Sequence, residues 1–218
     1  TVGGAANTAP VITSNGGGAS AALNVAENTT AVTTVTATDL DGDSLGYSIT
    51  GGADAGRFSI NPTTGVLTFA SAPNHELPTD SGNDNTYEVT VQVSDGQGGT
   101  DTQTITVTVT NVNEAPSFTS APVTGGTQGA AYNYTITTTD PDSGAVLAID
   151  ATTLPAWLSL TDNGDGTATL SGTPGAGEAG PHNVVLRVSD GTLSATQSFT
   201  VTVGGAANTA PVITSNGG

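Results

Sequence analysis

Several residue types that usually reveal a protein's chemistry are missing or scarce in this chain. Its 218 residues include no cysteine, no methionine, one tryptophan and two basic residues. Without cysteine the chain has no disulfides, no thiol catalysis and no cysteine-based zinc site. It also has no apolar run of about 18 residues and no basic start followed by an apolar segment, so we expect no membrane insertion and no signal peptide within it.

The charge balance is strongly one-sided. Nineteen Asp and Glu residues face two bases, Arg57 and Arg187, which leaves a formal net charge of -17. This sign argues against nucleic acid or an anionic membrane as a partner, because both would be repelled. We therefore expect a cation to be the natural partner, with solubility alone as the plainer interpretation of the acidic residues.

The two ends of the sequence are identical. Thr1–Gly17 reads TVGGAANTAPVITSNGG, and Thr202–Gly218 repeats these 17 residues without a change. The offset, 202 minus 1, gives a period of 201 residues. This period is far longer than a solenoid repeat and is long enough for one or two whole domains. Whether the duplication is natural or a cloning choice, it implies a tandem-repeat parent protein.

Alternating apolar and polar residues predict β-strands in many places. The alternation runs over 87–93, a turn rich in glycine follows at 95–99, and the alternation resumes over 105–109. This is the pattern of a β-hairpin with one buried face. It returns over 184–188 and 199–203. Abundant Thr and Val, with 30 Gly and 11 Pro, fit many short strands joined by turns, and no stretch predicts a helix.

The spacing of the expected strands indicates the fold class. Roughly seven strands per ~95 residues are typical of an immunoglobulin-like sandwich. The sequence therefore predicts an all-β protein with two tandem immunoglobulin-like (cadherin-like) Greek-key β-sandwiches. We place a preceding linker at 1–8, the sandwiches at 9–113 and 114–203, and a linker with the first strand of a further repeat at 204–218. Residues 210–218 should be disordered unless a neighbouring molecule supplies a sheet.

Six short motifs follow one another between residues 26 and 116. They are Ala26-Glu27-Asn28, Asp39-Leu40-Asp41, Phe58-Ser59-Ile60 with Thr64-Gly65-Val66-Leu67, Asn74-His75-Glu76, Asp95, and the linker Asn111-Val112-Asn113-Glu114-Ala115-Pro116. In this order the motifs resemble those of a bacterial cadherin-like domain. The resemblance implies a calcium-binding glutamate at Glu27, a D-x-D pair, a D-x-E position at Glu76 and a late aspartate at Asp95.

The second predicted domain carries different motifs. They are Leu154-Pro155-Ala156-Trp157-Leu158, Leu170-Ser171-Gly172-Thr173-Pro174 and Val188-Ser189-Asp190-Gly191. With these it resembles the dystroglycan-type cadherin-like and Ig-like modules of bacterial surface proteins. The domain keeps a D-x-D at Asp140-Pro141-Asp142. Gln128 replaces the early glutamate, and only Glu178 lies near the D-x-E segment.

Calcium is the cofactor that the resemblance implies, because Ca²⁺ takes about six to eight oxygen ligands from carboxylates, amides and backbone carbonyls. A junction between two domains can supply that many. The expected junction ligands are Glu27, Glu76, Asn111, Asn113, Glu114, Asp140, Asp142 and Asp190. A second set, toward the preceding repeat, is Asn7, Asp39, Asp41 and Asp95, and Asn208 serves the following repeat. Bound calcium would lock neighbouring domains together.

Two further acidic stretches allow separate loop calcium sites. Asp43 lies beside the D-x-D, and Asp162–Gly166 reads Asp-Asn-Gly-Asp-Gly. Asn-Gly and Asp-Gly are also the residues that hairpin turns require, so the turn is the favoured interpretation for this second stretch.

Catalysis and sugar binding find little support in the sequence. The only histidines, His75 and His182, lack the spacing of a zinc site or a catalytic triad, so we expect no enzyme. Paired carboxylates can hydrolyse glycosides, but the aromatic residues that stack on sugars are scarce. Trp157 fits a carbohydrate platform or a core residue, and its place between Pro155 and Leu158 favours the core.

Three functions are compatible with these features. The first is an extender repeat of a giant, secreted, calcium-dependent bacterial adhesin, similar to RTX adhesins, which acts in cell adhesion and biofilms at the cell surface. Its partners would be neighbouring repeats of the same chain, joined through calcium. The second is a repeat that assembles through homophilic lateral contacts into an extracellular filament, sheath or matrix. The third is an accessory module of a secreted glycanase.

Overall fold

The computed structural model describes residues 6–206. The chain divides into two compact units, Thr1–Val112 and Asn113–Gly218. Within the described part, no helix is long and apolar enough to cross a membrane. The expectations for Asn208 and for residues 210–218 lie outside the described residues.

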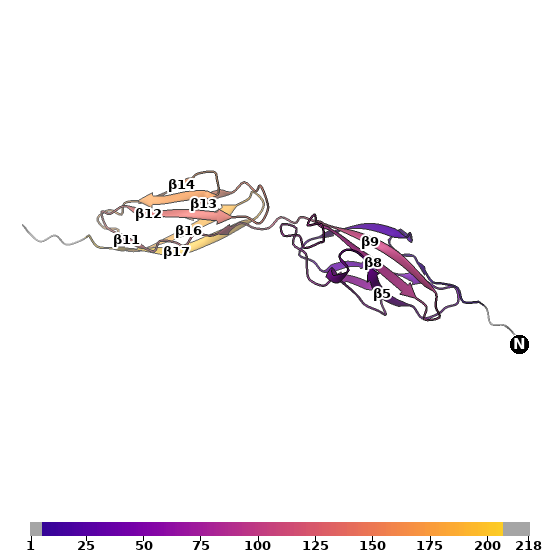
Figure 1. Ribbon diagram of the computed structural model, residues 1–218. Coiled ribbons are helices and arrows are strands. Elements are labelled where there is room, and N and C mark those ends of the chain that lie inside the picture. Colours follow the sequence, from indigo (N-terminus) through magenta and orange to yellow (C-terminus); the bar gives the residue numbers. More distant parts are fainter. Residues whose placement is uncertain (1–5, 207–218) are drawn as a thin grey trace, which may run out of the picture. The chain divides into compact units, whose positions relative to one another are not determined.

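The first unit is built from short strands with two single-turn 3-10 helices. In chain order these are β1 (Val11–Ile12), η1 (Ser14–Gly16), β2 (Ser20–Ala26), β3 (Ala31–Thr34), β4 (Ala37–Thr38), β5 (Gly46–Gly51), η2 (Ala55–Arg57), β6 (Phe58–Ile60), β7 (Val66–Phe69), β8 (Thr86–Ser94) and β9 (Thr100–Thr110). One sheet has the order β2-β9-β8-β5, a second has the order β3-β7-β6, and β1 pairs with β4. β2 runs parallel to β9, and β8 and β9 form the predicted hairpin (Figure 1).

The second unit repeats this architecture. Its strands are β10 (Ser117–Phe118), β11 (Gly125–Thr127), β12 (Tyr132–Thr139), β13 (Ala148–Thr153), β14 (Leu158–Asp162), β15 (Thr167–Gly172), β16 (Gly180–Ser189) and β17 (Ser194–Gly204). They form two four-stranded sheets, β10-β12-β15-β14 and β11-β17-β16-β13 (Figure 1). β11 runs parallel to β17, as β2 does to β9. The predicted all-β fold of two β-sandwiches is confirmed.

Each unit encloses its own core, which follows from the alternation in its strands. In the first unit the apolar residues of β8 and β9 point inward, and Tyr87 packs edge-on against Phe69 with ring centroids 5.2 Å apart. In the second unit the residues of β16 and β17 at the same positions of the hairpin pack against β12 and β15. Because a strand exposes every second residue to solvent, the outward positions are mostly threonine and serine.

One glycine of the cadherin-like motif is required by its backbone. Gly65 has a φ of +69°, and a Cβ at this position would collide with the carbonyl oxygen of Val35. The amide of Val35 in turn donates to the carbonyl oxygen of Gly65 at 2.8 Å. The turn before β7 therefore accepts only glycine without strain.

The loop between β7 and β8 is organised by a buried carboxylate. Asp80 is 3% exposed, and its oxygens accept hydrogen bonds from the amides of Gly82, Asp84 and Asn85 at 2.9, 3.1 and 3.0 Å. Burial acts to raise the pKa of Asp80, but these backbone hydrogen bonds outweigh it and hold the pKa below its ordinary value. The ionised carboxylate thus closes the loop.

We expect the first domain to lose stability in acid through Asp80. A carboxyl whose pKa is lower in the folded state contributes stability above its unfolded pKa of about 4, and this contribution disappears as the pH falls through the folded value. The Asp80→Asn variant should therefore be less stable at pH 7 by about 1–3 kcal/mol, with a smaller difference near pH 2. Urea unfolding at both pH values measures this, and an equal loss at both would contradict the role of the charge.

Candidate metal centres at the domain ends

Four aspartates gather at the end of the first domain where its chain enters. We call Asp39, Asp41, Asp43 and Asp95 the first entry set. Oxygens of the first three lie within 4.8 Å of one another. Oδ1 of Asp39 accepts hydrogen bonds from the amides of Asp41 and Asp43 at 2.8 and 3.3 Å, while its Oδ2 is buried and has no hydrogen-bond donor. A buried, unpaired carboxylate oxygen is costly unless a cation meets it.

The chain segment before β1 is tied to this set. Nδ2 of Asn7 donates to Oδ2 of Asp95 at 2.8 Å, and the amide of Thr8 donates to Oδ2 of Asp41 at 2.6 Å. The hydrogen bond from Asn7 is the main cause that lowers the pKa of Asp95. Desolvation and then the negative charges of Asp39, Asp41 and Asp95 raise the pKa of Asp43. Asp43 therefore shares the electrostatic environment of the D-x-D pair.

The entry end of the second domain has the same construction. Oδ1 of Asp140 accepts from the amide of Asp142 at 2.9 Å, and Oδ2 of Asp140 is buried without a donor. Nδ2 of Asn113 donates to Oδ2 of Asp190 at 2.8 Å, and the amide of Glu114 donates to Oδ2 of Asp142 at 2.8 Å. The hydrogen bond from Asn113 is the main cause that holds the pKa of Asp190 far below its ordinary value. We call Asp140, Asp142 and Asp190 the second entry set.

The exit end of the first domain is organised around a buried glutamate. Glu27 is 1% exposed and follows directly after β2. Its Oε2 accepts from the amide of His75 at 2.7 Å, and its Oε1 accepts from the amide of Val112 at 2.9 Å. Oε1 of Glu76 lies 3.3 Å from Nδ1 of His75, while Oε2 of Glu76 is buried without a donor. Glu27, His75 and Glu76 offer ligand atoms within 4.8 Å of one another.

The predicted junction ligands in the linker begin where β9 ends. Asn111 is exposed and comes directly after Thr110, the last residue of β9. Asn113 and Glu114 belong to the second unit and approach the second entry set, as described above. The eight predicted junction ligands thus fall into two groups: Glu27, Glu76 and Asn111 on the first unit, and Asn113, Glu114, Asp140, Asp142 and Asp190 on the second.

The exit end of the second domain has the same backbone frame with a different side chain. The amide of Glu27 donates to the carbonyl oxygen of Thr110, and the amide of Gln128 donates to that of Gly204, both at 3.0 Å. Oε1 of Gln128 accepts from the amide of Ala206 at 3.2 Å, just as Oε1 of Glu27 accepts from Val112. Gln128 therefore occupies the position of Glu27 but carries no charge.

The D-x-E position is also replaced at this end. The amides that follow Glu27 and Gln128 donate to the carbonyl oxygens of Pro73 and Pro174, both at 2.9 Å. Three residues after these prolines stand Glu76 and Gly177, respectively. Oε2 of the neighbouring Glu178 instead lies 3.5 Å from Nε2 of His182. At the exit end of the second domain, Gln128 and Gly177 thus stand in place of the two carboxylates, Glu27 and Glu76, of the first domain.

The Asp162–Gly166 stretch forms a turn, and Trp157 packs against the second core. Oδ1 of Asp162 accepts from the amide of Gly164, and Oδ1 of Asp165 accepts from the amide of Thr167, both at 3.0 Å. These contacts make a turn between β14 and β15. Trp157 packs against the second core, edge-on to Tyr132 with ring centroids 5.7 Å apart. The structure therefore favours the turn and the core interpretations.

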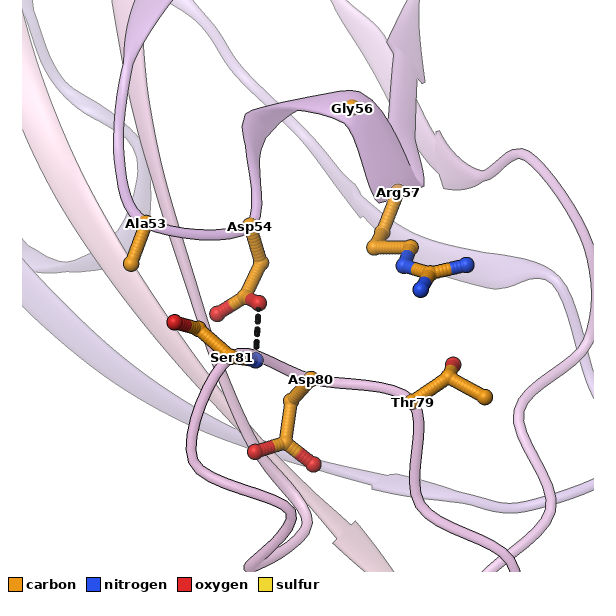
Figure 2. A pocket seen from close by; sticks show the side chains of 7 residues that line it. All are labelled: Ala53, Asp54, Gly56, Arg57, Thr79, Asp80 and Ser81. Carbon is orange, nitrogen blue, oxygen red and sulfur yellow. Dashed lines mark hydrogen bonds between the residues drawn. The ribbon is translucent and has the colours of Figure 1, made fainter.

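A hollow that the sequence did not indicate lies elsewhere on the first domain. It has a volume of about 510 Å³ and is lined by Ala53, Asp54, Gly56, Arg57, Thr79, Asp80 and Ser81 (Figure 2). Oδ1 of Asp54 accepts from the amide of Ser81 at 2.6 Å, and its Oδ2 accepts from the amide of Glu88 at 2.9 Å. The carboxylates of Asp54 and Asp80 therefore hold the wall of the hollow in place.

The donor chemistry of the domain ends fits a hard divalent cation. The ligand atoms are oxygens of carboxylates and amides, which Ca²⁺ prefers, and no cysteine is present to favour a softer metal. Buried oxygens of Asp39, Asp140 and Glu76 have no hydrogen-bond donor. These residues would hold the ion, and the ion would neutralise carboxylates that otherwise repel one another.

The two domains match different families. Residues 22–110 match the Cadherin domain family, and residues 115–204 match the family described as Putative Ig domain. None of the curated proteins matches the chain.

Several solved structures are similar to parts of this chain. Human protocadherin-24 EC1-2 is 20% identical, with a TM-score of 0.57, and the match covers 91% of this chain and 100% of that one. The protocadherin GammaB4 extracellular domain is 20% identical, with a TM-score of 0.52, over 89% of this chain and 32% of that one. An endo-fucoidan hydrolase of glycoside hydrolase family 107 is 25% identical, with a TM-score of 0.40, over 91% and 29%.

This chain therefore spans about a third of the length of the last two structures. The fold of this chain is similar to that of the two protocadherin structures. The chain thus carries a match to the Cadherin domain family over residues 22–110 and a match to the Putative Ig domain family over residues 115–204.

Proposed function

We propose that this chain is a calcium-stabilised structural repeat of an extracellular adhesion protein, an extender that spaces a terminal binding domain from a bacterial cell surface. The observation that carries the proposal is the buried, donor-free carboxylate oxygen on each of Asp39, Asp140 and Glu76. The three oxygens belong to three separate motifs, at both ends of the first domain and at the entry of the second. A hard cation is the partner that fits all of them.

The chain's own bases do not neutralise these carboxylates. Arg187 pairs with Asp150 on β13, and the hydrogen bond that Arg187 donates to Asp150 raises the pKa of Arg187. Arg57 lines the hollow described above, which contains none of the proposed calcium ligands. With 19 acidic residues and two basic ones, a cation from solution is the available source of positive charge.

We infer that calcium is shared between the exit of the first domain and the entry of the second. Glu27, Glu76 and Asn111 would supply one side, and the second entry set with Asn113 and Glu114 the other. The support is chemical: all of these residues offer oxygen ligands, and the same short linker carries Asn111, Asn113 and Glu114. An ion held by both groups would restrict the linker.

The exit of the second domain should need no calcium. Gln128 makes the same backbone contact as Glu27 without a charge, and Gly177 stands where the first domain has Glu76. The side chain of Gln128 is neutral, so it accepts the hydrogen bond from the amide of Ala206 without bringing a negative charge to this end of the domain. This hydrogen bond therefore persists without metal. In a tandem array, calcium at the junction after the second domain would then be held by the entry set of the next repeat alone, whereas the junction after the first domain would have carboxylates on both sides.

The cadherin match favours an adhesive rather than an enzymatic role, and we propose an extracellular location for the same reason.

One observation favours lateral assembly as a second candidate function. The outward residues of β12, β14 and β15 carry hydroxyl or amide groups and no charge, as in the cross-strand row of Thr135, Thr169 and Thr161. A chain with a net charge of -17 meets another copy most easily where neither surface is acidic.

Calcium should raise the melting temperature of the chain, because a ligand that binds only the folded state stabilises it by RT ln(1 + [L]/Kd). At 100 times Kd, this corresponds to a shift of roughly 10 °C for a domain of this size. Scanning calorimetry with calcium and with EDTA measures the shift. Identical curves would overturn the proposal.

A pair of variants distinguishes a ligand from an ordinary surface acid. Glu76→Gln removes a carboxylate of the exit end, and Glu88→Gln removes an exposed carboxylate on β8. We expect Glu76→Gln to weaken calcium binding about tenfold or more, because charge-assisted contacts of this kind are each worth about 1.5–3 kcal/mol. Glu88→Gln should leave it unchanged, and equal effects in a calorimetric titration would show a diffuse ion atmosphere instead of a site.

The two exits should respond differently to chelation in hydrogen exchange. EDTA should speed the exchange of the Val112 amide, which Glu27 holds, and leave that of Ala206 unchanged. Gln128→Ala should speed Ala206 about fivefold whether or not calcium is present, since one hydrogen bond is worth about 1 kcal/mol. If EDTA changed the exchange rate of the Ala206 amide, its hydrogen bond to Gln128 would depend on calcium, and this part of the proposal would be wrong.

A further inference from the structure

The hollow on the first domain is lined by one of the two basic residues of the chain. Arg57 is the last residue of η2, where its amide donates to the carbonyl oxygen of Asp54 at 2.8 Å and its carbonyl oxygen accepts from the amide of Ala70 at 2.7 Å. These two hydrogen bonds fix the backbone that carries the side chain. The side chain itself lies at the edge of the hollow and is exposed to solvent (Figure 2).

The guanidinium of Arg57 has no acidic partner within the described part of the chain. Its N–H groups make no ion pair or hydrogen bond there, whereas the other arginine is paired with Asp150. Asp54 and Asp80 line the same hollow, but their oxygens accept hydrogen bonds from backbone amides, as described above. An arginine that stays unpaired in a chain with 19 acidic residues is available for an anionic ligand.

Polar groups line the two sides of the hollow differently. Figure 2 shows the guanidinium of Arg57 and the hydroxyl of Thr79 on one side, and the carboxylate of Asp54 beside Ser81 on the other. The first side offers positively charged donors, which suit an anion. The second side offers acceptors, because a carboxylate oxygen keeps a free lone pair after it has accepted one hydrogen bond. The hollow therefore suits a ligand with an acidic group at one end and hydroxyl groups at the other.

The size of the hollow is that of a small-molecule site. Its volume of about 510 Å³ lies within the usual range for such sites. A smaller hollow of about 60 Å³ shares Gly56, Arg57 and Thr79 with it and reaches Phe69 and Tyr87. The hydroxyl oxygen of Tyr87 accepts from the amide of Thr79 at 3.2 Å and so holds Thr79 in place. No aromatic residue lines the larger hollow, so recognition there would rest on charge and hydrogen bonds.

We propose that this hollow binds a sugar acid, with the carboxylate of a hexuronic acid on Arg57 and the hydroxyl groups of its ring on Asp54 and Ser81. In a hexuronic acid the carboxylate and the hydroxyl groups of the far ring carbons stand at opposite ends of the ring, as the two sides of the hollow require. A planar guanidinium binds a carboxylate through two parallel hydrogen bonds. The site goes beyond the proposed function, since none of the proposed calcium ligands lines it.

The net charge of -17 restricts which acidic ligand can bind. A polymer with a negative charge on every sugar would be repelled by the many carboxylates of the domain, whereas one sugar acid brings a single charge and meets Arg57. Salt screens the more distant carboxylates beyond about 8 Å. We therefore expect the natural ligand to be a single acidic sugar, at a chain end or a side branch of a largely neutral glycan.

NMR spectroscopy of the full chain tests the proposal, because a titration reports both the affinity and the place of binding. D-glucuronate and D-galacturonate are compared with D-glucose and D-galactose, which lack the charge, and with acetate, which lacks the hydroxyl groups. We expect one of the uronates to shift the amides of Gly56, Arg57 and Ser81 saturably, and the neutral sugars and acetate to bind about tenfold more weakly or less. A neutral sugar or acetate that binds as tightly, or no shift at these amides, overturns the proposal.

The two arginines provide a matched pair of variants. Arg57→Gln and Arg187→Gln each remove one positive charge, but Arg187 lies in the second domain and pairs with Asp150. We expect Arg57→Gln to weaken uronate binding about tenfold, because it removes a charge-assisted contact, and Arg187→Gln to leave it unchanged. The guanidinium of Arg57 has no partner in the described structure, so Arg57→Gln should keep the fold, which its amide spectrum checks. Equal losses in the two variants would show attraction to any base instead of a site.

Repeating the titration in metal-free buffer separates this site from the proposed calcium sites. A uronate bound through calcium would shift the amides of His75 and Val112, which Glu27 holds, and these shifts would disappear without the metal. A uronate held by Arg57 should shift the amides around the hollow in both buffers. Shifts that need calcium would contradict the sugar-acid site and leave the proposed function intact.

Discussion

Carboxylates that face one another without a positive partner are the constraint on which this structure depends. Asp39, Asp41 and Asp43 bring their oxygens within 4.8 Å at the entry of the first domain, and two arginines in the whole chain cannot neutralise 19 acids. Backbone amides satisfy some of these oxygens, as at Glu27. A cation from solution would neutralise the carboxylates whose oxygens remain buried and without donors, and in this way the acidic composition supports the proposed function.

The fold was predictable because its signal is local. Alternating residues in β8 and β9 specify a hairpin with one buried face, and the register of the pair follows the predicted turn. The D-x-D pairs were also predictable, since both sit in short motifs. The family resemblance grouped Asn7 with Asp95 and Asn113 with Asp190. These contacts span 88 and 77 residues, so only the structure shows which atoms meet and that the two entry sets share one construction.

The equivalence of Glu27 and Gln128 required the structure for a similar reason. The sequence shows a departure from the family pattern at Gln128 but not what that residue does. Only the hydrogen bonds with Ala206 and Gly204 show that the neutral amide keeps the backbone contact of the glutamate. One backbone frame therefore serves two kinds of domain end, and a change from carboxylate to amide separates them. Asp43 belongs to the first entry set because its carboxylate offers an oxygen within 4.8 Å of those of Asp39 and Asp41, a distance that its place in the sequence did not show.

In the proposed function, calcium bound at the domain ends restricts the linker between the two domains. Small-angle X-ray scattering of the full chain, with calcium and then with EDTA, tests it most directly. We expect a narrow distribution of interatomic distances with calcium, and a broader one with a changed radius of gyration after chelation. Superimposable scattering curves in the two conditions would contradict it.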